Sequence, residues 1–98
     1  MGKKNLQHKN RIECDLIIKN ELGLHARPAA LFVKVANIFN ADVYLEKDGE
    51  RVNGKSIMGV MMLAASKGSK LKLVADGNDA EAAMQALRKL FEDRFGEE

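Results

Sequence analysis

The chain has a single proline, Pro28, and its position constrains the fold more than any other residue. Proline has no N–H to donate and clashes with the preceding turn, so an α-helix tolerates it only in the first turn. Residues 26–39, ARPAALFVKVANIF, show helical spacing, with Phe32 and Ala36 on the apolar side. The proline therefore predicts a helix over 26–39 that begins near residues 25–27.

The rest of the chain divides into further predicted strands and helices. Residues 11–18, RIECDLII, alternate apolar and polar side chains, as a half-buried strand does. The predicted elements, in order, are a strand at 11–18, a helix at 26–39, strands at 42–46 and 50–54 around an Asp48-Gly49 turn, a helix at 56–65, a strand at 70–76 and a helix at 80–94. This order, βαββαβα, is a split βαβ arrangement with an extra helix. It predicts an α+β fold: a four-stranded antiparallel sheet with three helices on one face, the other face being solvated.

Length and composition limit the class of protein. The 98 residues are 46% hydrophobic, which is enough for one domain with a core, and we interpret 1–10 as a flexible basic tail and 11–98 as the domain. No apolar run approaches the length of a membrane span, so no membrane insertion is expected. A net charge of +2 and the lack of an aromatic stacking platform argue against nucleic-acid binding. The single cysteine, Cys14, fits the reducing cytoplasm.

The residue that says most about function is His25, which stands just before the predicted helix. The first N–H groups of a helix lack helical partners, and the peptide dipoles add partial positive charge, so this end binds anions. The same charge disfavours the imidazolium form, and a neutral ring is a nucleophile. A phosphoryl group on His25 would be held by these N–H groups and by Arg27, whose planar fork of donors suits phosphate oxygens.

Two other interpretations of His25 stay open at this point. A lone histidine before a helix is often a polar cap or a solvated surface residue. A metal site is less favoured, because no cluster of histidine, cysteine or acidic residues has ligand spacing.

The predicted helix at 56–65 is apolar nearly all round. One face comprises Val60, Leu63 and Ala64, and much of the other comprises Ile57, Met58, Met61 and Met62. A helix on one side of a single sheet cannot bury both faces, so we expect the Ile/Met face to be exposed as a partner surface, unless the third helix covers it. Ser56 precedes this helix as an N-cap, where an added phosphate is electrostatically favoured.

Two segments together carry a family resemblance. GLHARPA (23–29) and VNGKSIMGVMMLAASKGS (52–69) resemble, in order and spacing, the signature regions of the HPr family, the histidine-containing phosphocarriers of the phosphoenolpyruvate:sugar phosphotransferase system. The resemblance covers roughly residues 11–95 and implies the family's open-faced sandwich fold. It also implies that Enzyme I phosphorylates His25 on Nδ1, using phosphoenolpyruvate, and that Arg27 lies beside the phosphate.

The resemblance further implies partners. Ser56 matches the serine phosphorylated by HPr kinase/phosphorylase. Ile57, Met58 and Met61, bordered by Leu24 and together with Arg27, match the docking surface for Enzyme I and the enzyme II A components. The expected protein is a cytoplasmic phosphotransfer intermediate in sugar uptake, with no cofactor and no metal, rather than a free-standing enzyme.

Three other functions stay open. The first is a regulatory or nitrogen-branch phosphocarrier of the same family that signals to proteins other than sugar permeases. The second is a pure interaction module controlled by Ser56, and the third is a nucleic-acid binder that uses the basic tail. Gly54 stands where many Gram-positive members have leucine, and His25 argues against the paralogues that lack this histidine.

Overall fold

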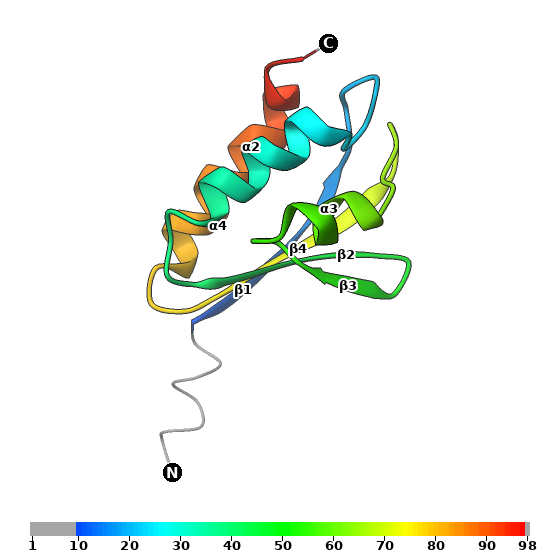
Figure 1. The fold of residues 1–98 in the computed structure, drawn as a ribbon. Helices are drawn as coiled ribbons and strands as arrows, with labels where there is room; N and C mark the ends of the chain where they lie inside the picture. The colour runs from blue at the N-terminus through cyan, green and yellow to red at the C-terminus, as the bar shows by residue number, and fades with distance from the viewer. Residues whose placement is uncertain (1–9, 98) are drawn as a thin grey trace.

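The structure is a computed structural model, and it describes residues 10–97. Its elements are β1 (Arg11–Ile17), α2 (Ala26–Ala36), β2 (Asp42–Lys47), β3 (Glu50–Asn53), α3 (Ile57–Met62), β4 (Lys70–Asp76), α4 (Ala80–Glu92) and the short 3-10 helix η1 (Arg94–Gly96). The strands form one antiparallel sheet in the order β1-β4-β2-β3 (Figure 1). The predicted α+β fold, with three helices on one face of a four-stranded sheet, is confirmed.

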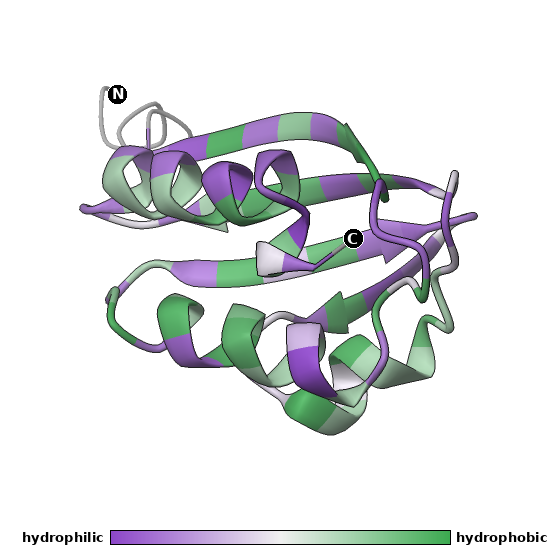
Figure 2. Ribbon diagram, turned by 90° about the horizontal axis from the view of Figure 1, so that it is seen from above, coloured by the Kyte–Doolittle hydropathy of each residue, from purple (hydrophilic) through white to green (hydrophobic). Residues whose placement is uncertain are grey.

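The strands follow from their alternating pattern. Figure 2 shows hydrophobic and hydrophilic residues alternating along the strands. Successive side chains of a strand point to opposite faces of the sheet, so one set faces the helices. The hairpin between β2 and β3 uses the predicted turn, in which Asp48 and Gly49 have φ angles of 52° and 85°. Two successive positive φ angles define the tight turn that matches the twist of the flanking strands, and the Asp-Gly pair suits it.

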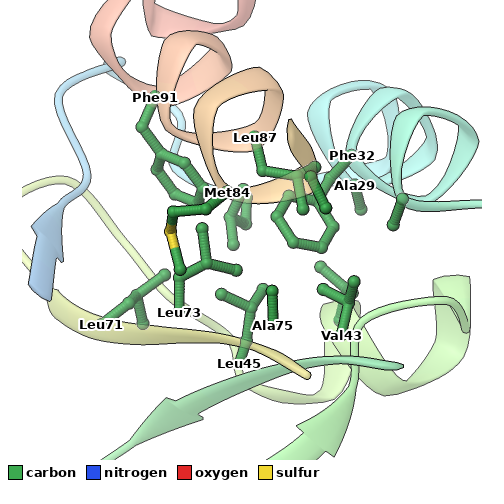
Figure 3. Close-up of a cluster of buried hydrophobic side chains, with 14 of the residues drawn as sticks. Ala29, Phe32, Val43, Leu45, Leu71, Leu73, Ala75, Met84, Leu87 and Phe91 are labelled. Atoms are coloured by element: carbon green, nitrogen blue, oxygen red, sulfur yellow. The ribbon is translucent and has the colours of Figure 1, made fainter. Parts of the chain in front are cut away.

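The core lies between the sheet and the helices. In Figure 3, side chains from α2 and α4 meet those of the central strands, and Phe32, Leu45, Leu73 and Leu87 are fully buried there. Each such side chain contributes about 1.5–3 kcal/mol when it leaves water. The Phe91 ring packs edge-on against Phe32, with ring centroids 6.0 Å apart. This packing fixes α2 against α4 and therefore fixes where the start of α2 lies.

Two predicted helices are shorter than expected. The helix predicted at 26–39 ends at Ala36, where the Asn37 side chain donates to the Val33 carbonyl oxygen at 2.9 Å. The helix predicted at 56–65 ends at Met62, and Ala64 has a φ of 49° and is exposed rather than buried. The chain leaves the helix here because the Ala65 carbonyl oxygen accepts the Leu24 N–H, so the segment must turn toward the start of α2.

The carboxyl end also differs from the prediction. The helix predicted at 80–94 ends at Glu92, and η1 then turns the chain back. Residues 1–9 of the predicted basic tail lie outside the described residues, whereas Asn10 accepts the Gly77 N–H at 3.0 Å and so contacts the folded domain. Among the helices of residues 10–97, none has both the length and the apolar character needed to cross a membrane.

Candidate functional site

A close approach of two backbone segments positions the start of α2. Gly23 has a φ of +69°, and a Cβ there would lie 2.4 Å from the Ala65 carbonyl oxygen, so only glycine fits. The same oxygen accepts the Leu24 N–H at 2.9 Å. His25 follows in an extended conformation as the N-cap of α2, and Pro28 lies buried in the first turn. The structure thus places the His25 ring at the amino end of a helix, as the proline predicts.

The His25 ring does not cap the helix. It makes no cap hydrogen bond, and its Nε2 instead lies 3.1 and 3.0 Å from the two carboxylate oxygens of Glu97. A carboxylate can only accept, so Nε2 carries the hydrogen, and in the neutral ring Nδ1 is left with the lone pair. The histidine side chain is 35% exposed, so part of the ring is accessible to a partner. The interpretation of the ring as a mere cap is therefore wrong.

Sequence reasoning did not find Glu97. It lies 72 residues from His25 in the chain, and no spacing pattern joins the two residues. The fold brings them together because α4 and η1 carry the carboxyl end back beside the start of α2 (Figure 1). Burial works to raise the pKa of the Glu97 carboxyl, but hydrogen bonds from His25 and Asn20 outweigh it and hold the pKa below its usual value. The group is therefore ionised at neutral pH.

Arg27 lies two residues after the histidine, on the first turn of α2. Its side chain is exposed and lines an open hollow together with Glu97, Glu21, Leu22 and Gly96. Within residues 10–97 its guanidinium forms no ion pair. A free guanidinium beside a helix amino end is suited to bind an anion.

Ser56 is the N-cap of α3, as its position in the sequence predicts. The Gly59 N–H donates to the Ser56 hydroxyl oxygen at 3.1 Å. A side chain at position 59 would crowd the end of β3, because a Cβ there would lie 3.1 Å from the Asn53 carbonyl oxygen. The serine hydroxyl is half-buried and adjoins the exposed face of the helix.

The apolar face of α3 is exposed, so the third helix does not cover it. Met58 is 73% exposed and Met62 67%, and Ile57 and Met61 are each about two-fifths exposed. Leu24 differs from the prediction, because only 4% of it is exposed and it belongs to the core. It therefore offers a partner little area. In the described part of the chain, no group of three or more histidine, cysteine or acidic side chains is placed to hold a metal ion.

The comparisons with known proteins agree with this geometry. Residues 12–93 match the family model for the PTS HPr component phosphorylation site. The chain belongs to the HPr family of phosphocarrier proteins. It is 49% identical over 87 residues to the phosphocarrier protein HPr of Xylella fastidiosa strain 9a5c, an alignment that covers 89% of this chain and 98% of that protein.

Other members of the HPr family are equally similar. The HPr-like protein Crh of Halalkalibacterium halodurans is 51% identical over 78% of this chain and 90% of its own. The crystal structure of HPr-C-His from Thermoanaerobacter tengcongensis superposes with a TM-score of 0.86 at 53% identity, over 89% of this chain and 98% of that one. The family match ends at residue 93, so the contact between Glu97 and His25 lies partly beyond it.

Proposed function

We propose that this HPr-family protein accepts a phosphoryl group on His25 from phosphoenolpyruvate through Enzyme I and passes it to enzyme II A components during sugar uptake. One observation supports the proposal: the His25 ring, at the amino end of α2, makes no cap hydrogen bond, and its Nε2 is engaged by Glu97, which leaves Nδ1 for the phosphoryl group. The lone pair, the helix N–H groups and the guanidinium of Arg27 supply a nucleophile and the partners for an anion in one place.

The transfer is a displacement at phosphorus. The lone pair of Nδ1 forms the new N–P bond while the bond from phosphorus to the donor atom breaks, and the donor keeps that electron pair. The helix amino end and Arg27 neutralise the oxygens of the phosphoryl group during and after the step. Onward transfer to the acceptor is the same displacement, with Nδ1 as the leaving group. The site is open, which suits a carrier that must present the group to one protein after another.

The exposed Ile57, Met58 and Met61 form the surface on which Enzyme I and the enzyme II A components dock in this proposal. They are large, flexible and adaptable side chains, and such surfaces suit several partners. HPr kinase/phosphorylase would modify Ser56 at the edge of this surface. A phosphate there adds a charge of about −2 beside the apolar face and repels a partner with an acidic rim.

The working place in this proposal is the cytoplasm, where phosphoenolpyruvate and the soluble partners are found. A regulatory or nitrogen-branch carrier is the second candidate, because relatives named HPr-like protein Crh match as closely as those named HPr. The two candidates share the chemistry at His25 and differ in the acceptor. Assays of phosphoryl transfer from this chain to enzyme II A components and to signalling acceptors would separate them.

The first experiment is phosphorylation by purified Enzyme I and phosphoenolpyruvate. The chain has two histidines, so His25→Ala is compared with the matched variant His8→Ala. Wild type and His8→Ala should gain one acid-labile phosphate with the ³¹P signal of an Nδ1-phosphohistidine, and His25→Ala should gain none. Phosphate on His25→Ala, or none on the wild type with an Enzyme I that phosphorylates another carrier, contradicts the proposal.

A further inference from the structure

We infer that Glu97 is a positioning residue for His25: its carboxylate holds the Nε2–H tautomer, so that Nδ1 is the nitrogen that receives the phosphoryl group. This inference rests on the proposed function, and it assigns a role to a residue outside the segment that matches the family. It rests on the contact of the His25 ring with Glu97, on the contacts that hold Glu97 and on the fold of the carboxyl end.

The contact itself fixes the tautomer. Both oxygens of the Glu97 carboxylate lie within 3.1 Å of Nε2, and within residues 10–97 the ring has no other hydrogen-bond partner. A free imidazole in water places its single hydrogen on either nitrogen. A carboxylate that accepts from Nε2 selects one of these forms and orients the ring, as acidic partners do for histidines in other sites.

Asn20 donates a hydrogen bond to the Glu97 carboxylate and so fixes its position. The Asn20 side chain is 1% exposed, and its amide donates to a Glu97 oxygen at 3.1 Å and to the Gly23 carbonyl oxygen at 2.7 Å. The second bond ties the amide to the loop that also places His25. Asn20, Glu97 and His25 therefore form a chain of hydrogen bonds in which each group fixes the next.

The carboxyl end is folded to bring Glu97 there. Arg94 and Phe95 have φ angles of 54° and 53°, which side chains other than glycine rarely adopt. Such a conformation persists where its surroundings compensate for it. Here Phe95 is 6% exposed and packs edge-on against Phe91, with ring centroids 4.9 Å apart. The buried ring fixes η1, and Glu97 follows two residues later.

The carboxylate also suits the charge that transfer creates. When Nδ1 bonds to phosphorus, the ring becomes positively charged, and that charge is shared with the Nε2–H. Glu97 faces this hydrogen, while Arg27 and the amino end of α2 face the phosphoryl oxygens in the proposed function. Each developing charge thus has its own partner, and the hydrogen stays on Nε2 throughout.

The test measures the tautomer first, because this readout does not depend on phosphoryl transfer. Full-length protein is labelled with ¹⁵N-histidine, and the ring nitrogens of His25 are observed at a pH at which the ring is neutral. Wild type should be almost entirely the Nε2–H form, and Glu97→Ala should be a mixture. Glu97→Gln keeps an accepting oxygen and should restore the preference. Glu21→Gln is the matched control: Glu21 lines the same hollow but pairs with Lys67.

The second readout is the rate of phosphorylation by phosphorylated Enzyme I. Glu97→Ala should lower kcat about tenfold, equivalent to about 1.4 kcal/mol, with KM for Enzyme I unchanged. Glu97→Gln should recover part of the rate, and Glu21→Gln should equal the wild type. A wild-type ring without tautomer preference, or Glu97→Ala with wild-type tautomer and rate, overturns the inference. If no variant is phosphorylated, wild type included, the proposed function fails instead, and the tautomer result still decides the role of Glu97.

Discussion

At the scale of single residues, the site separates two tasks between the two sides of one ring. On one side, Glu97 takes the Nε2–H of His25. On the other, in the proposed function, Nδ1 receives a phosphoryl group whose oxygens contact Arg27 and the amino end of α2. Arg27 forms no ion pair within residues 10–97, so in the proposed function none of these residues has to release its guanidinium before it contacts the phosphoryl group. An engaged imidazole, and a guanidinium without an ion pair in the described part of the chain, suit the proposed carrier with its one reactive nitrogen.

Replacement of Arg27 tests the role of its guanidinium. Arg27→Ala should slow phosphorylation by Enzyme I about tenfold or more, because a charge-assisted contact to the phosphoryl oxygens is lost. Arg27→Lys should recover only part of the rate, since an ammonium group keeps the charge but not the planar pair of donors. Lys34→Ala, which removes an exposed charge farther along α2, is the control. Wild-type rates for Arg27→Ala, with unchanged circular dichroism, would remove the arginine from the site.

At the scale of elements, α3 joins an exposed apolar face to a capped amino end in only six residues. Helices this short depend on their caps and on tertiary packing, because nucleation costs more than a few hydrogen bonds return. Val60 supplies the packing, being fully buried, and Ser56 supplies the cap. The stability of this element and its proposed use as a docking surface therefore both depend on Ser56.

Two substitutions of Ser56 separate these roles. Aspartate is as good an N-cap as serine, so Ser56→Asp should keep the stability while its charge weakens binding to Enzyme I. Ser56→Ala lacks the cap and should lose about 1 kcal/mol of the free energy of unfolding, with binding unchanged. Thermal unfolding and calorimetric titration with Enzyme I measure the two quantities. Equal affinity of Ser56→Asp and wild type would refute the proposed switch.

At the scale of the whole molecule, sequence patterns predicted the features that depend on residues close together in the chain. Pro28 predicted the start of α2, the alternating segments predicted the strands, and Asp48-Gly49 predicted the hairpin turn. The position of Glu97 is different, because it depends on a left-handed turn at Arg94 and Phe95 that neither residue type signals. That turn is stabilised by burial against Phe91, which no local window contains. The place of His25 at the amino end of α2 could therefore be predicted from the sequence, and its contact with Glu97 could not.

A second long-range contact joins Asp79 to the connection between α2 and β2. Asp79 precedes α4 as its N-cap, yet its side chain makes no cap hydrogen bond. Its carboxylate instead accepts the N–H groups of Asn40 and Ala41, at 2.9 and 2.8 Å. These bonds tie the start of α4 to the connection between α2 and β2. The bond from Asn40 is the main cause that lowers the pKa of Asp79, with that from Ala41 adding to it against the opposing effect of burial.

The lowered pKa makes a prediction about acid unfolding. An aspartate whose pKa is lower in the folded state stabilises the fold above its unfolded pKa, about 3.9, and this contribution is lost as pH falls through the folded value. Asp79→Asn removes the charge, so it should unfold more easily at pH 7 and lose less of its stability between about pH 5 and pH 2. Urea unfolding at several pH values measures both effects. The control is Asp48→Asn, since asparagine also accepts the positive φ of that exposed turn. If Asp79→Asn and wild type keep a constant difference in the free energy of unfolding across this range, the carboxylate does not tie α4 to the rest of the fold.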